Sequence, residues 1–269
     1  MQTEDNALEI VLELAASEPA QRPEFFRLLL ESTVFILATS GQLERQGEGP
    51  ITLKEDTQIQ ITNWVKPDGS RVIPFFSSLR ALQLAVNQGE KYVALPARTF
   101  FEMTRGAELI MNPRSPFGKE FTPAEIEALL AEGVNKVAKR MVVEKATEVL
   151  LGQPANYPHA MVASLTALLA NHPNVKAAYL AQMFDRTRDE KPHLIIGIEV
   201  DRDVENTIRE VGVVASDTAP DREPVDLIRV DSGDSGIGKY FLKEVKPFYE
   251  RDPNAAEPKG WLGRLLHRK

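Results

Sequence analysis

The 269-residue chain contains no cysteine. This absence excludes disulfides, thiolate nucleophiles and cysteine-bound zinc or iron–sulfur centres. No apolar run approaches the roughly 18 residues that are needed to span a bilayer. The opening residues, MQTEDNALEI, lack the basic region that begins a secretory signal. We therefore expect a cytoplasmic protein without redox or sulfur-transfer chemistry.

Basic residues are too few to suit a nucleic-acid-binding protein. The net charge is −7, whereas proteins that bind phosphate backbones display a basic face. The charge is uneven along the chain, because residues 251–269 hold five basic and two acidic residues. This segment carries +3 and leaves −10 for residues 1–250. We expect no nucleic acid partner, and the last segment is electrostatically distinct from the rest.

Residue patterns for catalysis or metal binding are also missing from the sequence. The histidines His159, His172, His193 and His267 follow no metal-ligand spacing, and we expect each of them at the surface or at a helix cap. No serine stands in a GxSxG context, so no nucleophile elbow is predicted. We expect no metal, no cofactor and no enzymatic activity.

The length and the 43% hydrophobic composition suit two domains. Predicted helices and strands alternate, and glycines follow the helices, which is typical of α/β layering. We predict an α+β or mixed α/β fold with two compact domains, each a small mixed sheet with flanking helices. The domains cover residues 1–121 and 149–250, with a helical bridge at 122–148 and a flexible tail at 251–269.

The first domain contains a predicted hairpin. Residues 58–65 and 71–76 are β-rich, and the turn KPDG lies between them. Pro74 marks the second strand as an edge strand or a bulge, because proline cannot donate to a ladder. Further helices are predicted at 4–16, from about 23, at 79–87 and at 98–104, and further strands at 33–39, 91–95 and 108–111.

The strongest local signal opens the bridge. Thr122 can cap a helix, Pro123 suits its first turn and Glu125 completes a capping box, while Phe121 and Ile126 form a hydrophobic staple. This helix is predicted to end near residue 132. Residues 134–151 suit either a continuing helix or a strand at 149–151. In the second domain, helices are predicted at 159–171 and 203–215, and strands at 175–184, 193–200 and 225–230.

Residues 233–240, GDSGIGKY, lie one residue away from the phosphate-binding pattern GxxxxGK[ST]. Tyr240 stands where a short hydroxyl is needed, and two aspartates put negative charge where phosphate would bind. We therefore predict a glycine-rich turn, not a nucleotide site. Exposed polar loops suit contact with a partner, and the candidate residues of this loop are Asp231, Asp234, Gly236, Gly238, Lys239 and Tyr240.

Residues 201–205, DRDVE, resemble DxDx[TV], in which the first aspartate is a phosphate-accepting nucleophile. Glu205 stands where Thr or Val belongs, so we favour an N-cap followed by acidic residues in the first helical turn. The alternative function is a ligand sensor or an enzyme that binds an amino acid or phosphate in a pocket between the domains. Its participants would be Asp201, Asp203 and Lys239.

The end of the chain, KGWLGRLLHRK at 259–269, has apolar residues at i, i+1, i+4 and i+5, surrounded by basic ones. On a flexible tether, such a segment folds when it meets a groove or an anionic surface. The alternatives for this segment are docking to a partner, contact with a membrane surface, and packing on its own domain or disorder. The candidate docking residues are Trp261, Leu262, Arg264, Leu265 and Leu266.

Several long segments resemble a known family. They are FFSSLRALQLAVNQGEKYVALPARTFFEM and AELIMNP in the first domain, then VLLGQPANYPHAMVASLTALLANHPNVKAAYLAQMF and SGIGKYFLKEVKPFYER in the second. Together they resemble the enhanced serine sensitivity family, SseB, over nearly the whole chain. The resemblance implies a bacterial cytoplasmic protein linked to altered sensitivity to serine, and it implies no catalytic residues. We therefore expect a non-enzymatic interaction or regulatory protein whose partner is another protein.

Overall fold

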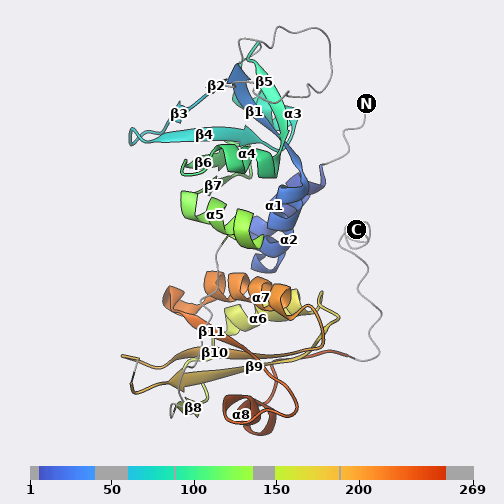
Figure 1. Cartoon of the computed structure of the whole chain (residues 1–269), viewed down its shortest axis with the longest axis vertical. Coiled ribbons are helices and arrows are strands. Elements are labelled where there is room, and N and C mark those ends of the chain that lie inside the picture. Colours follow the sequence, from blue (N-terminus) through green and yellow to red (C-terminus); the bar gives the residue numbers. More distant parts are fainter. Residues whose placement is uncertain (1–5, 40–59, 88, 136–148, 188, 253–269) are drawn as a thin grey trace. The chain divides into compact units, whose positions relative to one another are not determined.

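The computed structural model describes residues 6–39, 60–87, 89–135, 149–187 and 189–252. The chain divides into two compact units, residues 1–136 and 137–269, coloured from blue to green and from yellow to red in Figure 1. Each unit combines parallel and antiparallel strand pairs in a sheet with flanking helices. The predicted fold class is therefore confirmed.

The N-terminal unit contains five described α-helices and a mixed sheet. The helices are α1 (Ala7–Ser17), α2 (Arg22–Glu31), α3 (Leu79–Ala85), α4 (Ala97–Met103) and α5 (Pro123–Glu132), with a 3-10 turn at Pro19–Gln21. The strands are β1 (Thr33–Thr39), β2 (Gln60–Ile61), β3 (Trp64–Val65), β4 (Arg71–Phe76), β5 (Tyr92–Pro96), β6 (Leu109–Met111) and β7 (Lys119–Phe121). In the described residues the sheet runs β2-β1-β4-β6-β7, with β3 beside β4 and β5 beside β1.

The two faces of this sheet are covered by different helices. Phe75 and Phe76 are consecutive on β4, so their side chains point to opposite faces. Phe75 packs against the α4 rings Phe100 and Phe101, at centroid distances of 5.3 and 5.8 Å. Phe76 packs instead with Leu82 and two alanines of α3. Figure 1 shows α4 and α3 at different sides of the sheet accordingly.

The prediction that Pro74 marks an edge or a bulge is wrong, because β4 is an interior strand. On one side β4 pairs with the parallel strand β6, and the Ile73 N–H donates to the Glu108 carbonyl. On its other side, β4 pairs with β3 through Val72 and with β1 through Phe75. Pro74 lies where the partner changes from β3 to β1, so the missing N–H leaves no ladder hydrogen bond unmade.

The hairpin between β3 and β4 is confirmed, with antiparallel pairing of Trp64 and Val72. The described part of the predicted strand 58–65 is divided into β2 and β3, because the chain changes partner there. The Thr62 N–H still donates to the Leu37 carbonyl of β1, whereas Trp64 pairs with β4. The helix predicted at 79–87 ends at Ala85, where Val86 becomes extended.

The capping box of α5 is confirmed. The Glu125 backbone N–H donates to Thr122 Oγ1 at 3.2 Å, and the Thr122 backbone N–H donates to Glu125 Oε2 at 3.0 Å. Gly133, at φ 72°, ends the helix. α5 packs against α4 and lies within the N-terminal unit, so the predicted bridge begins with a packed helix of this unit. Residues 136–148 of that bridge lie outside the described residues.

The C-terminal unit has one sheet in its described part, ordered β11-β10-β9-β12 with β8 beside β9. Only β10 and β11 run parallel to each other among these pairs. The elements are β8 (Leu150–Gly152), α6 (His159–Leu169), β9 (Val175–Phe184), β10 (His193–Val200), α7 (Val204–Thr218), a 3-10 turn at Pro220–Arg222, β11 (Val225–Arg229), α8 (Ile237–Glu244) and β12 (Tyr249–Glu250).

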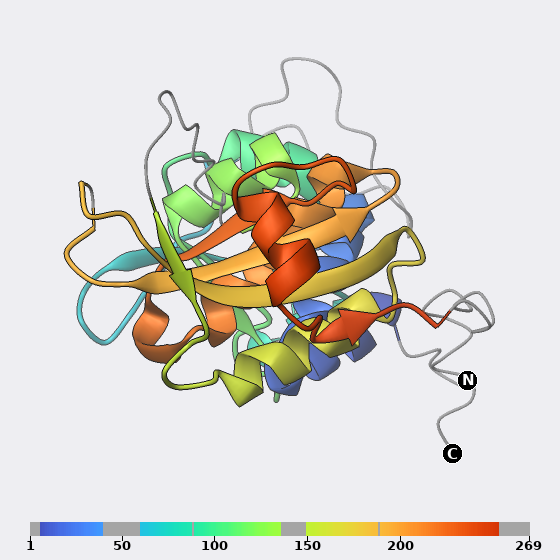
Figure 2. The ribbon, with the colours of Figure 1, turned by 90° about the horizontal axis from the view of Figure 1, so that it is seen from below.

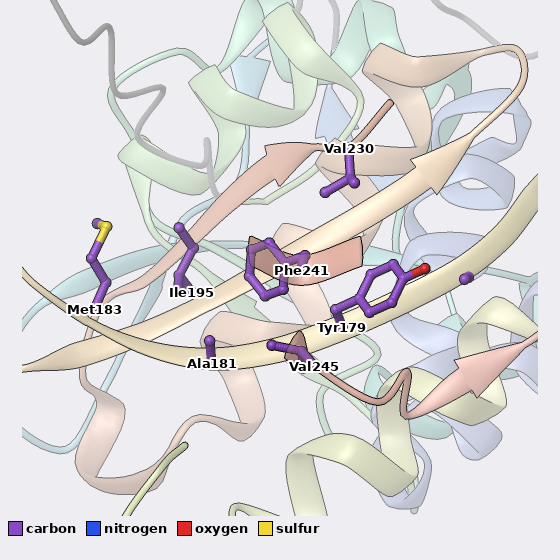
Figure 3. Packing of buried hydrophobic residues seen from close by; sticks show 8 residues of the cluster. Tyr179, Ala181, Met183, Ile195, Val230, Phe241 and Val245 are labelled. Carbon is purple, nitrogen blue, oxygen red and sulfur yellow. The ribbon is translucent and has the colours of Figure 1, made fainter. Parts of the chain in front are cut away.

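Helices again cover the two faces unequally. α6 and α7 pack together on one face, and α8 lies across the strands on the other (Figures 1 and 2). Phe241 of α8 points onto the sheet among Tyr179, Ile195 and Val230 (Figure 3). A Cβ at Gly197 would lie 2.8 Å from the Phe241 ring. Glycine at this position of β10 therefore makes the space that the ring fills.

We predict that Glu125→Gln destabilises the N-terminal unit by about 1–2 kcal/mol at pH 7, because charge-assisted hydrogen bonds are lost. Burial raises the pKa of Glu125, but hydrogen bonds from the Thr122 N–H and from Lys119 outweigh it, and the pKa is lowered from 4.5. A lowered pKa in the folded state gives stability that is present above the ordinary value and is lost as the pH falls through the folded one.

Urea unfolding of the full chain at pH 7 and at acid pH measures this difference. Glu127→Gln on the same helix is the matched control, because Glu127 forms an exposed ion pair with Arg105 and its loss is expected to cost less than about 0.5 kcal/mol. An equal effect of both substitutions, or a Glu125→Gln effect that persists at low pH, would contradict the assignment.

Candidate functional site

The candidate loop and the predicted aspartates meet at one edge of the C-terminal sheet. β10 and β11 are parallel neighbours, so their carboxyl ends lie side by side. Asp201 and Asp203 follow β10, and residues 231–236 follow β11. α7 then leaves toward one face and α8 toward the other. This arrangement is the strand-order switch point at which open α/β sheets bind ligands.

The loop after β11 leads into a helix that the sequence analysis missed. α8 begins at Ile237, and the Tyr240 N–H donates to the Gly236 carbonyl at 3.1 Å. Strand, glycine loop and helix therefore follow one another as in a phosphate-binding loop. Gly236, at φ 61° and ψ −124°, has a backbone conformation that side chains disfavour.

The Asp234 carboxylate occupies the start of α8. Its Oδ2 accepts the Asp231 N–H at 2.8 Å, and the Asp234 N–H donates to the Asp231 carbonyl at 3.0 Å. A Cβ at Gly238 would lie 2.3 Å from Asp234 Oδ2, so the carboxylate packs against the first turn of the helix. A phosphate at this helix end would meet negative charge instead of free N–H groups.

The remaining loop candidates separate into two environments. Asp231 is exposed and accepts a hydrogen bond from Arg229 at 2.9 Å. Lys239 is exposed, without an ion pair among the described residues. Tyr240 is half-buried, and its ring packs edge-on against Phe241 at 6.3 Å. Asp231, Asp234, Gly236 and Gly238 therefore lie together in the turn at the start of α8. Tyr240 instead packs against the hydrophobic core that contains Phe241.

Asp201 and Asp203 differ in their contacts. Asp201 accepts from Lys176 at 2.7 Å, and this hydrogen bond lowers the pKa of the Asp201 carboxyl. Asp203 occupies the N-cap position of α7 but its side chain makes no capping hydrogen bond, so that part of the capping prediction is wrong. Its φ of 51° places the residue in the left-handed region instead of the extended conformation of an ordinary N-cap.

A buried pair that the sequence analysis missed holds this turn in place. Asn174 Nδ2 donates to the Arg202 carbonyl at 2.7 Å and to Thr207 Oγ1 at 2.8 Å. Asn174 is 8% exposed and Thr207 is fully buried. Thr207 is a polar residue on the otherwise apolar buried face of α7, and this break in the pattern could have revealed the pair from the sequence.

No group of three or more potential metal ligands occurs in the described residues. His193 lies between two carboxylates, with Nε2 2.8 Å from Asp226 and Nδ1 3.4 Å from Asp189. His172 lies 3.1 Å from Glu210. Both side chains are partly buried, and the sequence analysis did not predict their carboxylate partners. The His172 N–H also donates to the Leu169 carbonyl at the end of α6, which agrees with a capping position. His159 is exposed, as predicted, and His267 lies outside the described residues.

A second polar cluster in the N-terminal unit was not predicted. Glu9 Oε1 accepts the hydroxyls of Ser77 and Ser78 at 2.6 Å each. Asn112, at φ 50°, accepts the Ser77 N–H at 2.9 Å and donates to Ser77 Oγ at 2.8 Å. These hydrogen bonds fix α1 to the carboxyl ends of β4 and β6. The polar groups satisfy one another, which is typical of a structural cluster.

The comparisons with known proteins agree with the two-part fold. The SseB protein N-terminal domain matches residues 8–128, and the SseB protein C-terminal domain matches residues 143–251. The chain therefore belongs to the SseB family, and the predicted resemblance is confirmed.

Two curated relatives extend over most of the chain. They are Protein SseB of Escherichia coli (strain K12) and Protein SseB of Shigella flexneri, each 43% identical over 246 residues. The matched region covers 91% of this chain and 92% of each relative. No solved structure matches the chain.

None of the helices in the described ranges is both long and apolar enough to cross a membrane. The predicted docking residues at 261–266 lie outside those ranges.

We predict that Gly238→Ala destabilises the C-terminal unit by about 1–3 kcal/mol, because the added methyl group overlaps the Asp234 carboxylate. The added methyl group would also lie 2.5 Å from the Asp234 Cβ, so the clash is removed only when residue 234 has no side chain. In an Asp234→Gly background Gly238→Ala is expected to be neutral or to stabilise by up to about 1 kcal/mol, since alanine is the better helix former. Urea unfolding of the four proteins in this double-mutant cycle measures the sign change.

Gly236→Ala is the matched control. Its left-handed φ makes any side chain unfavourable, so it should destabilise equally in both backgrounds. A Gly238→Ala effect that Asp234→Gly does not alter would show that the Asp234 side chain does not lie against α8.

Proposed function

We propose that this chain is a non-enzymatic interaction protein of the bacterial cytoplasm, which docks to another protein through its basic apolar segment at 259–269. The spacing of Trp261, Leu262, Leu265 and Leu266 carries the proposal, because these side chains would share one face if the segment folded as a helix on its partner. The link to serine sensitivity, which the family resemblance implies, would then act through the partner.

The described residues that precede the segment support this proposal. The last strand, β12, pairs with β9, and the Arg251 N–H donates to the Lys176 carbonyl at 2.8 Å. The family match also ends at residue 251. Residues 253–258 span at most about 20 Å when extended. A docking helix on such a short tether would stay close to the anchored end of the sheet.

The contacts at the switch point favour a binding protein over an enzyme. Asp201 is paired with Lys176, Asp231 with Arg229, and Asp234 accepts a backbone N–H. Groups that serve in proton transfer or nucleophilic attack must be available to a substrate. The net charge of −7 favours a protein partner over nucleic acid.

A ligand sensor is the second candidate function, and one observation favours it. The switch point after β10 and β11 brings Asp203 and the loop after β11 to one edge of the sheet. Asp234 at the start of α8 disfavours phosphate there, which leaves an amino acid as the preferred ligand among those predicted. This site would lie within the C-terminal unit. It differs from the pocket between the domains that the sequence analysis predicts, which stays a prediction.

We predict that the apolar stripe decides partner capture. The full chain, immobilised, should retain a partner from bacterial lysate that Trp261→Ala/Leu265→Ala loses at least about tenfold, since each buried side chain contributes about 1.5–3 kcal/mol. Quantitative mass spectrometry measures the difference. Asn254→Ala, in the same tail but outside the stripe, should retain the partner. An identical set of partners after removal of 259–269 would refute the proposal.

For the sensor, thermal unfolding with amino acids, nucleotides, inorganic phosphate and divalent metals is the measurement. A true ligand at a hundredfold excess over its dissociation constant stabilises the fold by about 2.7 kcal/mol. If the switch point binds it, Asp203→Asn should abolish the shift, and Glu205→Gln in the first turn of α7 should not. Absence of any shift favours the interaction function, and a shift with nucleotides would contradict the assignment of Asp234.

A further inference from the structure

One face of the N-terminal sheet is covered by a single short helix in the described residues, and we call it the α3 face. Register defines its members, because paired residues in neighbouring strands share a face. Phe35 pairs with Phe76, Leu37 with Tyr92, and Trp64 with Val72, which lies four residues before Phe76. The α3 face therefore comprises α3 together with Phe35, Leu37, Trp64, Phe76 and Tyr92.

The cover that α3 provides is small. With seven residues it is about 10 Å long. Its alanines and Leu82 bury Leu37 and Phe76, while Phe35 and Trp64 stay half-buried beside them. The opposite face carries α4, which packs against α2 and α5 in turn. The apolar width of the sheet thus exceeds what α3 can bury.

Large apolar side chains remain exposed on and around α3. Leu84 is 57% exposed, and Leu79 and Tyr92 are 38% exposed each. The Tyr92 ring lies 6.1 Å from Phe35, so it continues the half-buried aromatic row of the sheet. Single exposed apolar residues are ordinary. An apolar surface that continues from a core onto the outside is typical of an interaction site.

Two arginines lie at this face in the described residues. Arg80 is exposed, lies one helical turn from Leu84, and has no ion pair among the described residues. The Arg114 guanidinium lies 5.7 Å from the Trp64 ring centre and donates to the Ala85 carbonyl at the end of α3. The strands β1 and β5 contain no charged residue. Glu90 and Lys91, in the turn before β5, are of opposite sign.

We propose that the α3 face is a docking surface for an acidic amphipathic segment of another protein. Leu79, Leu84 and Tyr92 would meet its apolar side chains, and Arg80 and Arg114 its carboxylates. The complementarity of charge selects this occupant. A second copy would bring like charges together, and the basic segment at 259–269 would be repelled. Two arginines in a chain of net charge −7 are too few for an anionic membrane.

This inference deepens the proposed interaction function but does not depend on the segment at 259–269. The probe is a display library of random peptides selected on the full chain and counter-selected on Leu84→Asp. The expected peptides combine apolar residues three or four apart with Asp or Glu. The chain has two tryptophans, so Trp261→Phe leaves Trp64, on the α3 face, as the reporter of binding by a synthetic selected peptide.

Matched variants decide the result. Leu84→Asp should weaken binding of the selected peptide at least about tenfold, and Arg80→Glu by about two- to fivefold, with loss of part of the salt dependence. Met103→Asp, at an exposed apolar residue of α4, should leave binding unchanged. Equal melting temperatures of the variants show that the fold is intact. A chain ending at residue 252 should bind the peptide as the full chain does.

Three outcomes would overturn the proposal. The first is that the selected peptides are basic, or that none of them needs Leu84 for binding. The second is self-association in sedimentation that Leu84→Asp abolishes, which would make a second copy the occupant. The third is Leu84-dependent binding to phosphatidylserine vesicles, which would make the face a membrane contact. Loss of a lysate partner on removal of 259–269 would concern the other proposal alone.

Discussion

Both sheets of this protein present two apolar faces, and the order of elements provides substantial helical cover for only one of them. α4 and α5 in the first unit, and α6 and α7 in the second, pack as pairs of helices. The other faces receive α3 and α8, of seven and eight residues. Since a sheet side chain left in water forfeits its burial energy, each short helix must be positioned by specific contacts. The residues that do so are also the ones that shape the candidate sites.

The two short helices solve this problem differently. The N-cap of α3 is Ser78, whose hydroxyl accepts the Ala81 N–H and donates to Glu9, so a part-buried polar cluster fixes the beginning of the helix. The N-cap of α8 is Gly236, and the Asp234 carboxylate lies against Gly238 in the first turn. Phe241 fills the space at Gly197 and holds the helix on the sheet. α8 therefore closes its sheet well. α3 leaves Leu84 and Tyr92 exposed, so its face keeps apolar surface available for a partner.

Local signals made much of this fold predictable. The capping box at Thr122 and Glu125 fixed the start of α5, and β-rich runs bounded by turns gave β1, β4, β9 and β10 with the limits that the structure has. Non-local causes explain the failures. Pro74 lies inside a sheet because β4 changes partner at that residue. α8 forms after the loop because Phe241 packs against Gly197 on β10, which is distant in the sequence. Gly197 within an apolar strand was an unused signal of that close approach. The spatial meeting of residues 201–203 with residues 231–236 depends on a parallel pairing that no short pattern encodes.

Charge connects the two proposed docking elements. Residues 1–250 carry −10, yet the segment at 259–269 and the α3 face both combine apolar side chains with positive charge. An acidic partner is repelled by the body of the chain at long range and attracted only where a cation lies next to an exposed apolar group. Such local contrast favours one orientation of the encounter and suppresses non-specific contacts. Because surface charge is screened within about 8 Å at physiological ionic strength, the apolar contacts would supply most of the affinity, and the arginines would supply the choice of partner.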